Sequence, residues 1–330
     1  MIGNRRDSEN RLVVVLGGAG FIGSHLCREL VARGYKVRIL SRIGSSHHLV
    51  SDIGDKVEIV EGDILSPYDV LDAIGDAETL LHLVHTTVPG SSMIEPEYDI
   101  TNNVVGSVRW LTQLSKTNIR RLFYFSSGGT VYGVPVKIPI DESHPTNPIC
   151  SYGVTKLAIE KYMALYSSQL DIDCYILRPS NVYGPGQQLH KGQGVIGVLA
   201  DRVLREEPID VFGTGMSQRD YLYIEDLVSA VMALLDYQGQ QRVFNISCER
   251  GHSVNDIIQI LQQQLGHIRR ITPRPERGFD VPINVLSSLR LRTETEWESA
   301  IKLEDGIART INWLRLGAPA AIEFLESINS

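Results

Sequence analysis

The chain has 330 residues, of which 43% are hydrophobic and 22% charged, a composition typical of a globular protein with enough apolar material for a large core. The net charge of -7 and the pI of about 5.7 argue against nucleic acid or an anionic membrane as a main partner. No apolar run approaches the ~20 residues that span a bilayer, and residues 1–10 lack the apolar segment of a secretory signal. The sequence therefore predicts a cytoplasmic protein.

The four cysteines, at positions 27, 150, 174 and 248, lie far apart in the sequence. No pair has a Cys-x-x-Cys or other metal-type spacing. We therefore expect reduced thiols and no metal site.

In the first half of the chain, short apolar runs alternate with helical patterns, as in β-α-β units around a parallel sheet. The predicted strands are Leu12–Leu16, Lys36–Leu40, Val57–Val60, Thr79–Val84, Arg121–Phe125 and Cys174–Leu177. Helices are predicted from Phe21 to Gly34, from Pro67 with Ser66 as its N-cap, as one long pattern between residues 85 and 120, and from Tyr152 to Gln169.

After Asn181, glycines and prolines interrupt this alternation and predict a loop-rich lobe. The further predicted elements are a helix at Asp226–Asp236, a strand at Val243–Ile246, a helix from Ser253 to Leu265, a loop at Pro273–Asn284 and a helix at Glu304–Leu314. The predicted fold is a Rossmann-type, doubly wound parallel α/β sheet with a smaller α/β C-terminal lobe. We expect the dinucleotide-binding domain to span residues 1–182 and 222–250, and the substrate lobe to span 183–221 and 251–330.

A glycine-rich loop separates the first predicted strand from the first helix. Gly17 permits a tight turn, Gly20 permits close approach to a pyrophosphate, and Gly23 permits close packing of helix on strand. Because the loop has a strand before it and a helix after it, it predicts a nicotinamide dinucleotide site, with the phosphates at the helix N-terminus.

The end of the second strand bears on the choice between NAD and NADP. An acidic residue there would bind the ribose hydroxyls of NAD, but this chain has Ser41 and Arg42. Either these two residues accept a 2′-phosphate, or Arg42 is a surface arginine beside the adenine, so the sequence leaves NAD and NADP open. Asp63 and Ile64 follow the third strand, where they are placed to reach the adenine or simply to form a turn.

Tyr152 and Lys156 are four residues apart, so on a helix their side chains share one face. A free phenol, with a pKa of ~10, is a poor base at neutral pH, and a nearby ammonium favours its ionised form. The pair therefore predicts a general base or acid for a sugar hydroxyl. Ser127 and Thr130 follow the strand that ends at Phe125, at the sheet edge where ligands bind, and we expect Ser127 to donate to the substrate oxygen.

Together these motifs resemble the extended short-chain dehydrogenase/reductases, in the NAD-dependent nucleotide-sugar epimerase and dehydratase branch, over about residues 11–315. Further matching segments are Asn103 in Asn-Val-Val-Gly, residues 178–186 from Arg-Pro-Ser-Asn onward, and Arg219-Asp220-Tyr221. The resemblance implies that the cofactor is held by Gly17, Gly20, Phe21, Ile22, Gly23, Ser41, Arg42, Asp63, Ile64, Asn103, Tyr152 and Lys156. It implies that a nucleoside-diphosphate sugar, with UDP as the favoured nucleotide, is held by Ser127, Thr130, Asn181, Arg219, Arg277 and Asn284. It also implies NAD as the cofactor, and a homodimer through helices near Tyr98–Leu114 and Tyr152–Gln169.

The sequence departs from this family at Gly128. UDP-glucose 4-epimerases carry a serine or threonine there, four residues before the tyrosine of Val-Tyr-Gly, so the hydroxyl role passes to Ser127 or Thr130. The 4,6-dehydratases carry Thr-Asp-Glu in this segment, and the absence of a carboxylate here argues against that reaction. Asn284 occupies the position that limits the sugar's size in the 4-epimerases. Because asparagine is smaller than tyrosine, we expect an N-acetylhexosamine to fit.

The function predicted from these residues is a nucleoside-diphosphate-sugar 4-epimerase that works through a 4-keto sugar, with Tyr152, Lys156 and Ser127 as catalytic residues. One alternative is an NADP-dependent reductase or dehydrogenase of a keto-sugar or other carbonyl, favoured by Arg42. A second is a non-enzymatic dinucleotide sensor, which would need neither Tyr152 nor Lys156.

Overall fold

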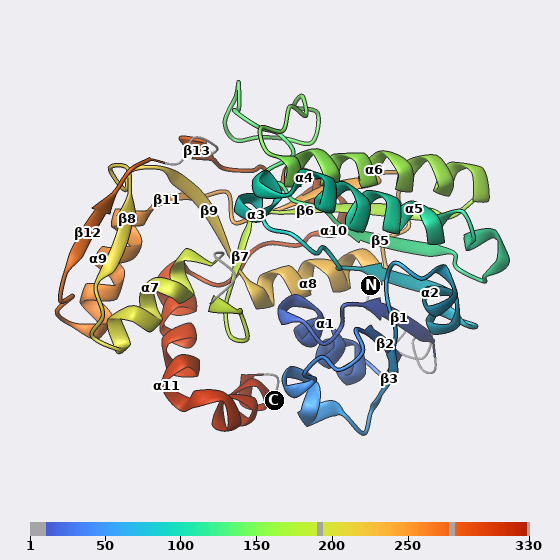
Figure 1. The fold of residues 1–330 in the computed structure, drawn as a ribbon, viewed down its shortest axis with the longest axis horizontal. Helices are drawn as coiled ribbons and strands as arrows, with labels where there is room; N and C mark the ends of the chain where they lie inside the picture. The colour runs from blue at the N-terminus through green and yellow to red at the C-terminus, as the bar shows by residue number, and fades with distance from the viewer. Residues whose placement is uncertain (1–10, 190–193, 277–280, 329–330) are drawn as a thin grey trace. The chain divides into compact units, whose positions relative to one another are not determined.

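The structure is a computed structural model, which describes residues 11–189, 194–276 and 281–328 (Figure 1). The chain forms two compact units. The first unit comprises the residues up to Ser126 together with Val154–Leu177, and the second comprises Ser127–Gly153 together with Arg178–Ile328. The division into a dinucleotide-binding domain and a substrate lobe is a functional one, and it stays a prediction.

The main sheet has seven strands in the order β10-β6-β5-β4-β1-β2-β3. In chain order these are β1 (Leu12–Leu16), β2 (Lys36–Ser41), β3 (Val57–Glu61), β4 (Thr79–His82), β5 (Arg121–Phe125), β6 (Asp173–Pro179) and β10 (Val243–Ile246). The described pairs from β3 to β6 are parallel. The order reverses next to β1, as in dinucleotide-binding sheets, so the predicted fold class is confirmed.

The apolar strand runs form the core of this sheet. In β1, Val14, Val15 and Leu16 are fully buried. Such continuous burial, in place of alternation, is expected where helices cover both faces of a parallel sheet. The helix α1 (Phe21–Ala32) packs against β1 and β2, and α2 (Pro67–Ile74) packs against β2.

The predicted cap of α2 is confirmed. Ser66 is the N-cap, its hydroxyl oxygen accepts from the Asp69 backbone N–H at 3.3 Å, and Pro67 occupies the first helical position. The Asp69 carboxylate accepts from the Asp63 backbone N–H at 2.8 Å, and this bond lowers the pKa of the carboxyl. The cap therefore also fixes the turn that follows β3.

The long helical pattern predicted between residues 85 and 120 is confirmed in outline, but Glu95 interrupts it and its middle is π-helical. The chain there forms successive helices, which are contiguous from Pro96 to Leu111. They are α3 (Pro89–Ile94), α4 (Pro96–Asp99), the π-helical η2 (Ile100–Val105), α5 (Gly106–Leu111) and the 3₁₀ turn η3 (Leu114–Lys116). Pro89 and Pro96 each begin a new helix, since proline lacks the backbone N–H that a helix interior needs. Another 3₁₀ turn, η1 (His48–Ile53), packs against α1.

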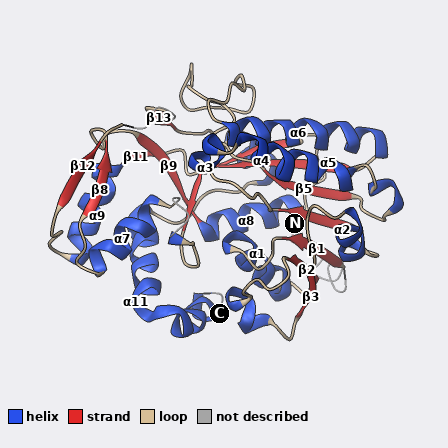
Figure 2. Cartoon of the chain, viewed as in Figure 1, coloured by secondary structure: helices blue, strands red, loops and turns tan. Residues whose placement is uncertain are grey.

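The second unit has more regular structure than the predicted loop-rich lobe. Its small sheets contain β7 (Asn181–Tyr183), β8 (Ile209–Phe212), β9 (Gln218–Tyr223), β11 (Gly251–Ser253), β12 (Ile271–Arg274) and β13 (Ile283–Asn284), shown red in Figure 2. Its helices are α7 (Val195–Leu204), α8 (Ile224–Leu235), α9 (Val254–Leu265), α10 (Leu289–Thr295) and α11 (Leu303–Ile328). The predicted loop at Pro273–Asn284 is wrong at both ends, where β12 and β13 form. Pro273 is tolerated in β12 because that strand pairs with β8 alone in its sheet.

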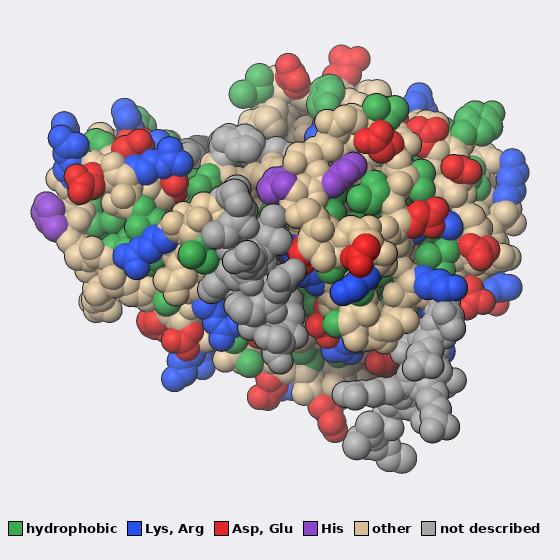
Figure 3. All heavy atoms as spheres, turned by 90° about the horizontal axis from the view of Figure 1, so that it is seen from below, with side chains coloured by type: hydrophobic (Ala, Val, Ile, Leu, Met, Phe, Trp, Pro, Cys, Tyr) green, Lys and Arg blue, Asp and Glu red, His purple; other side chains and the backbone are tan. Residues whose placement is uncertain are grey.

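Charged side chains of both signs are interspersed on the face shown in Figure 3. Among the described residues, no helix is long and apolar enough to cross a bilayer. The same residues contain no cluster of histidine, cysteine and acidic side chains that would suit a metal ion.

Candidate active site

The glycine loop joins β1 to α1 in the first unit and has the form of a phosphate cradle. A Cβ added to Gly23 would lie 2.3 Å from the Gly17 carbonyl oxygen, so only glycine lets the helix start this close to the loop. Gly20 is the N-cap of α1 and offers no side-chain cap, and the first turn holds no acidic residue. These bare N-terminal amides, with Phe21 and Ile22 in the first turn, fit the pyrophosphate of a dinucleotide.

The end of β2 lies beside this loop, because the Gly17 backbone N–H donates to the Leu40 carbonyl at 3.1 Å. Ser41 follows directly and is buried, whereas Arg42 is exposed. The structure therefore brings the predicted cofactor residues of the glycine loop and of the β2 end together.

Asp63 and Ile64 form the turn after β3. One oxygen of the Asp63 carboxylate accepts from the Leu65 backbone N–H at 2.9 Å, and Ile64 is buried. This oxygen of Asp63 thus stabilises the turn, as one of the two interpretations expected. Contact of Asp63 with an adenine stays a prediction.

Asn103 lies in η2 and is 4% exposed. Its amide oxygen accepts from the Thr86 backbone N–H at 2.8 Å and from the Thr86 hydroxyl at 3.2 Å. Its amide nitrogen donates to the Asp99 carboxylate at 2.9 Å and to the Asp99 carbonyl at 3.0 Å. Asn103 therefore fixes the segment after β4, and its predicted contact with the cofactor stays a prediction.

Asp99, which no sequence motif indicated, is fully buried in the first unit. Its carboxylate accepts from the Thr87 hydroxyl at 2.5 Å and from the Thr155 hydroxyl at 3.1 Å, and it lies 3.4 Å from Nε2 of His85. Its spacing of four residues before Asn103 on a helix was the available signal. Asp99 joins the segment after β4 to α6 (Ser151–Leu170).

Lys156 lies on α6, is 3% exposed, and donates from Nζ to the Phe125 carbonyl at 2.7 Å. The ammonium thus lies at the carboxyl end of β5. Burial lowers the pKa of Lys156 to about 7, although the carboxylates of Glu160 and Asp99 oppose the shift. The Ser126 hydroxyl donates to Glu160, so the acid that supports the ammonium is itself held in place.

Tyr152 lies one helical turn before Lys156 on α6 and is half-buried. In the second unit, the start of α6 approaches the segment that follows β5. A Cβ on Gly153 would lie 2.8 Å from the Thr130 carbonyl oxygen, so glycine permits this contact. The Thr130 hydroxyl is buried and has no hydrogen-bond partner among the described residues, as expected of a group facing a ligand.

Two polar side chains of the second unit face Gly129. A Cβ there would lie 3.3 Å from Oδ1 of Asn181 and 3.8 Å from Oγ of Ser127. Neighbouring Gly128 has no room for a side chain, since a Cβ would lie 2.3 Å from Cδ1 of Leu286 and 2.9 Å from the Arg178 carbonyl oxygen. The packing around position 128 therefore excludes the serine or threonine side chain that the 4-epimerases carry there.

Asn284 and Arg219 lie side by side on the paired strands β13 and β9. Asn284 is 1% exposed and donates from Nδ2 to the Gly128 carbonyl at 3.2 Å. Arg219 donates to the Val281 carbonyl at 2.7 Å. Contact of either residue with a sugar nucleotide stays a prediction, and Arg277 lies outside the described residues.

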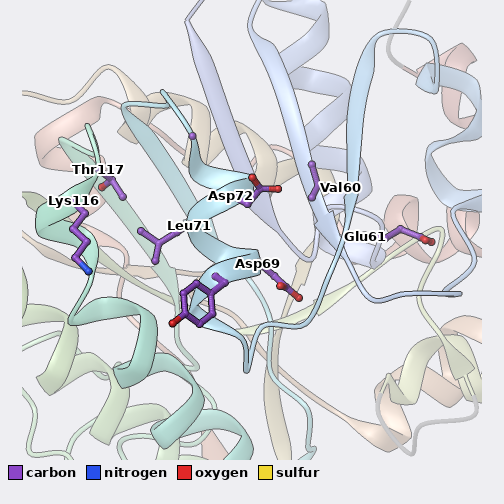
Figure 4. A pocket seen from close by; sticks show the side chains of 9 residues that line it. Val60, Glu61, Asp69, Leu71, Asp72, Lys116 and Thr117 are labelled. Carbon is purple, nitrogen blue, oxygen red and sulfur yellow. The ribbon is translucent and has the colours of Figure 1, made fainter.

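A surface hollow in the first unit is lined by none of the predicted site residues (Figure 4). Its lining residues are Val60, Glu61, Tyr68, Asp69, Leu71, Asp72, Gly75, Lys116 and Thr117. The polar groups that could bind a ligand or transfer a proton lie instead around the glycine loop and at the two ends of the Tyr152–Lys156 turn.

A glycine cradle at the switch point of a doubly wound sheet, followed by a tyrosine and a buried lysine one turn apart, defines a dinucleotide-dependent enzyme of the Rossmann class. The family model described as "NAD dependent epimerase/dehydratase family" matches residues 13–247. The chain belongs to this family, which confirms the resemblance inferred from the motifs.

Individual relatives are similar over nearly the whole chain. A UDP-glucose 4-epimerase of Mycolicibacterium smegmatis is 32% identical, over 92% of this chain and 98% of its own. A dTDP-4-dehydro-6-deoxyglucose reductase of Escherichia coli is 30% identical, over 94% and 99%. The crystal structure of UDP-glucose 4-epimerase with UDP-glucose from Thermotoga maritima is 30% identical, with a TM-score of 0.86 over 92% of this chain and 98% of that one. Members that share this fold thus include different sugar-nucleotide reactions.

Proposed function

We propose that the protein is a nucleoside-diphosphate-sugar 4-epimerase. The observation that carries this proposal is the placement of Tyr152 one turn before Lys156 on α6, with the Lys156 ammonium held on the Phe125 carbonyl at the end of β5. The likeness to UDP-glucose 4-epimerases over most of the chain supports it.

In this proposal Tyr152 takes the proton from the sugar's C4 hydroxyl and later returns it. A cation one turn away stabilises the phenolate form of a tyrosine. With its pKa near 7, Lys156 is partly charged at neutral pH, which suits proton transfer near that pH. When bound, a nicotinamide cofactor would supply the hydride acceptor and donor for C4, and return of the hydride to the other face of the 4-keto sugar would invert C4.

The second-unit hydroxyls would orient the substrate in the absence of a serine at position 128. Ser127 is the group we assign to the C4 oxygen, and it faces the same glycine as Asn181. The unpartnered Thr130 hydroxyl is the other candidate for this role. We assign Asn181 and Arg219 to the nucleoside-diphosphate sugar, with UDP as the nucleotide by likeness to the relatives.

We also propose that the site accepts N-acetylhexosamines. Asn284 is short and is held against the Gly128 carbonyl, which keeps its amide close to the backbone. Assays with UDP-glucose and UDP-N-acetylglucosamine test this, and complete refusal of the acetylated sugar would contradict it.

The epimerase proposal is tested by the variant Tyr152→Phe in an assay for interconversion of UDP-glucose and UDP-galactose, and of their N-acetyl forms. Loss of general acid–base catalysis lowers kcat by about 10²- to 10⁴-fold, while cofactor affinity should stay within a few-fold. Tyr166→Phe, half-buried on the same helix, is the matched control and should keep full activity. A fully active Tyr152→Phe enzyme would refute the proposed role.

A second candidate is an NADP-dependent reductase of a keto-sugar. It is favoured by the likeness to dTDP-4-dehydro-6-deoxyglucose reductase and by Ser41 and Arg42 at the β2 end. Stoichiometric oxidation of NADPH by a 4-keto sugar, with no epimerisation by the wild type, would select it.

We further propose that the protein is a homodimer through helices of the first unit. The Thr155 hydroxyl bonds to Asp99, which joins α6 to α4, and apolar side chains next to both residues are exposed. We call this set the helical patch; it consists of Tyr98, Ile100, Val105, Val154, Tyr162 and Leu165. Several large exposed apolar side chains on neighbouring helices often mark an interface.

A further inference from the structure

The residues directly after β2 form a compact polar turn beside the glycine loop. Gly17 bonds to Leu40, the residue before Ser41, so the turn begins next to the phosphate cradle. At this position a dinucleotide-binding sheet recognises the ribose of the adenosine half. A carboxylate there bonds to the free 2′-hydroxyl, whereas an arginine nearby accommodates a 2′-phosphate.

Hydroxyl and imidazole groups converge within this turn. The Oγ of Ser41 lies 2.8 Å from Oγ of Ser45 and 3.0 Å from Nε2 of His47. The Ser45 backbone N–H donates to the Arg42 carbonyl at 3.1 Å, which closes a four-residue turn. Gly44 supplies the positive φ of 69° that the third position of such a turn requires. Ser41 is therefore a fixed and buried part of the turn.

The residues of the turn itself include a cationic side chain, that of Arg42, and no anionic one. Residues 41–51 contain an arginine and two histidines but no carboxylate. The next acid, Asp52, is bound to Arg28 in a buried pair, with 2.8 Å between Oδ1 and a guanidinium nitrogen. Glu61 faces the turn from β3, and its carboxylate accepts from the Gly44 backbone N–H at 3.3 Å. The Arg42 side chain is exposed, so it is accessible to a ligand at this turn.

We propose that the segment Ser41–His48, here called the β2 turn, binds the 2′-phosphate of NADP(H), so that this chain prefers NADP(H) within a family described as NAD dependent. The proposal rests on the dinucleotide-dependent function proposed above. Arg42 provides the charged donor for the phosphate. Ser41, which Ser45 and His47 hold within the turn, replaces the carboxylate that would repel the phosphate. NAD has no 2′-phosphate to pair with the Arg42 guanidinium. Ser41 has no carboxylate to bind the 2′-hydroxyl of the NAD ribose.

The test is isothermal titration of the cofactor-stripped full-length protein with NADP⁺ and with NAD⁺, without any sugar. Wild type should bind NADP⁺ at least tenfold more tightly than NAD⁺. Arg42→Ala should lose at least fivefold in affinity for NADP⁺ and change its affinity for NAD⁺ less than twofold. Ser41→Asp should reverse the preference, because it restores a carboxylate and repels the phosphate.

The matched control is Arg33→Ala, which removes an exposed arginine that pairs with Glu29 at 2.6 Å on α1, and it should bind both cofactors as wild type does. Equal or tighter binding of NAD⁺ by wild type would overturn the proposal, as would an Arg42→Ala variant with unchanged affinity for NADP⁺. Because no sugar is present, these outcomes are independent of whether the enzyme epimerises, and an NAD preference would leave the 4-epimerase proposal intact.

Discussion

Three charged residues of the first unit are buried close to one another, and each is compensated by the protein. Asp99 is fully buried and accepts hydrogen bonds from two threonine hydroxyls and an amide. Glu160 accepts from Ser126. Lys156 donates to a carbonyl at the end of β5, and its charged form is stabilised by both acids. Burying unpaired charges would cost several kcal/mol each, so this network holds the lysine in place without fully suppressing its charge.

The titration of Lys156 should be visible in the stability of the protein. Its pKa falls from an ordinary value of 10.5 to about 7 in the folded state because the ammonium is desolvated. Between these two values the unfolded chain holds a proton that the folded chain has released, so this residue makes the protein more stable as pH rises from 7 toward 10.

Lys156→Met should remove this contribution. We expect the free energy of unfolding of wild type to rise by about 1 to 2 kcal/mol more than that of the variant between pH 7.5 and pH 9. Urea denaturation at each pH measures the difference. Lys161→Met, on the same helix but exposed, should follow the wild type. Parallel pH profiles for wild type and Lys156→Met would show that Lys156 has an ordinary pKa.

At the scale of elements, the glycine loop combines two separate requirements. Gly23 is needed by the fold, because its Cβ would overlap the backbone of Gly17 and Gly18 at 2.3 and 2.6 Å. Gly20 has an extended backbone, with φ of -84°, and a Cβ there would lie 3.3 Å from the Gly17 oxygen, so the fold nearly tolerates a side chain. The need for a phosphate to approach the backbone closely explains better why this position is glycine.

Alanine substitutions should separate the two requirements. Gly23→Ala should destabilise the protein by about 1 to 3 kcal/mol, since backbone atoms must move, and should weaken cofactor binding as well. Gly20→Ala should cost about 1 kcal/mol or less, yet reduce cofactor affinity tenfold or more. Thermal unfolding and cofactor titration on the same samples measure both effects. If Gly20→Ala bound the cofactor normally, the phosphates would not lie at this N-cap.

The elements that could be predicted from sequence are those whose signal is local. The strands β1 to β6 are buried apolar runs, and α2 has a serine cap and a proline start, so pattern alone locates them within one or two residues. The strands β7, β11 and β13 have only two or three residues, too few for a periodic pattern, and they exist because they pair with β9. Pro96 in the sequence indicates the break at Glu95, but the helical periodicity on both sides of it predicts one continuous helix.

The candidate site was predictable to the same extent. Tyr152, Lys156 and the glycines are close in sequence to the elements that position them. Asp99 had only its spacing from Asn103 as a signal, and its importance comes from hydrogen bonds to Thr87 and to Thr155, the second of which is 56 residues away. The packing at Gly128 depends on Leu286, more than 150 residues later, and only the folded chain shows why that position lacks a side chain.

At the scale of the whole molecule, the helical patch is the feature that a single chain does not explain. Its residues on α6 are Val154, Tyr162 and Leu165, which are eight and three residues apart and so lie on one side of the helix. Leu165 is 49% exposed and Tyr162 is 39% exposed, so this apolar stripe faces outward. Covering such a stripe with a second copy of itself is the symmetric solution that most homo-oligomers adopt.

Leu165→Arg should therefore disrupt the dimer. Sedimentation velocity of wild type should give twice the chain mass of 36.7 kDa, whereas the variant should need at least a tenfold higher concentration to dimerise, because a buried unpaired charge is costly. Leu289→Arg is the matched control, since Leu289 is an exposed leucine of α10 at 58% that lies outside the helical patch, and it should sediment as wild type does. Because Lys156 and the glycine loop belong to the same unit as the patch, a folded monomeric variant should still bind the cofactor. A wild type that sediments as a monomer at micromolar concentration, or a fully dimeric Leu165→Arg variant, would mean that this stripe is not the interface.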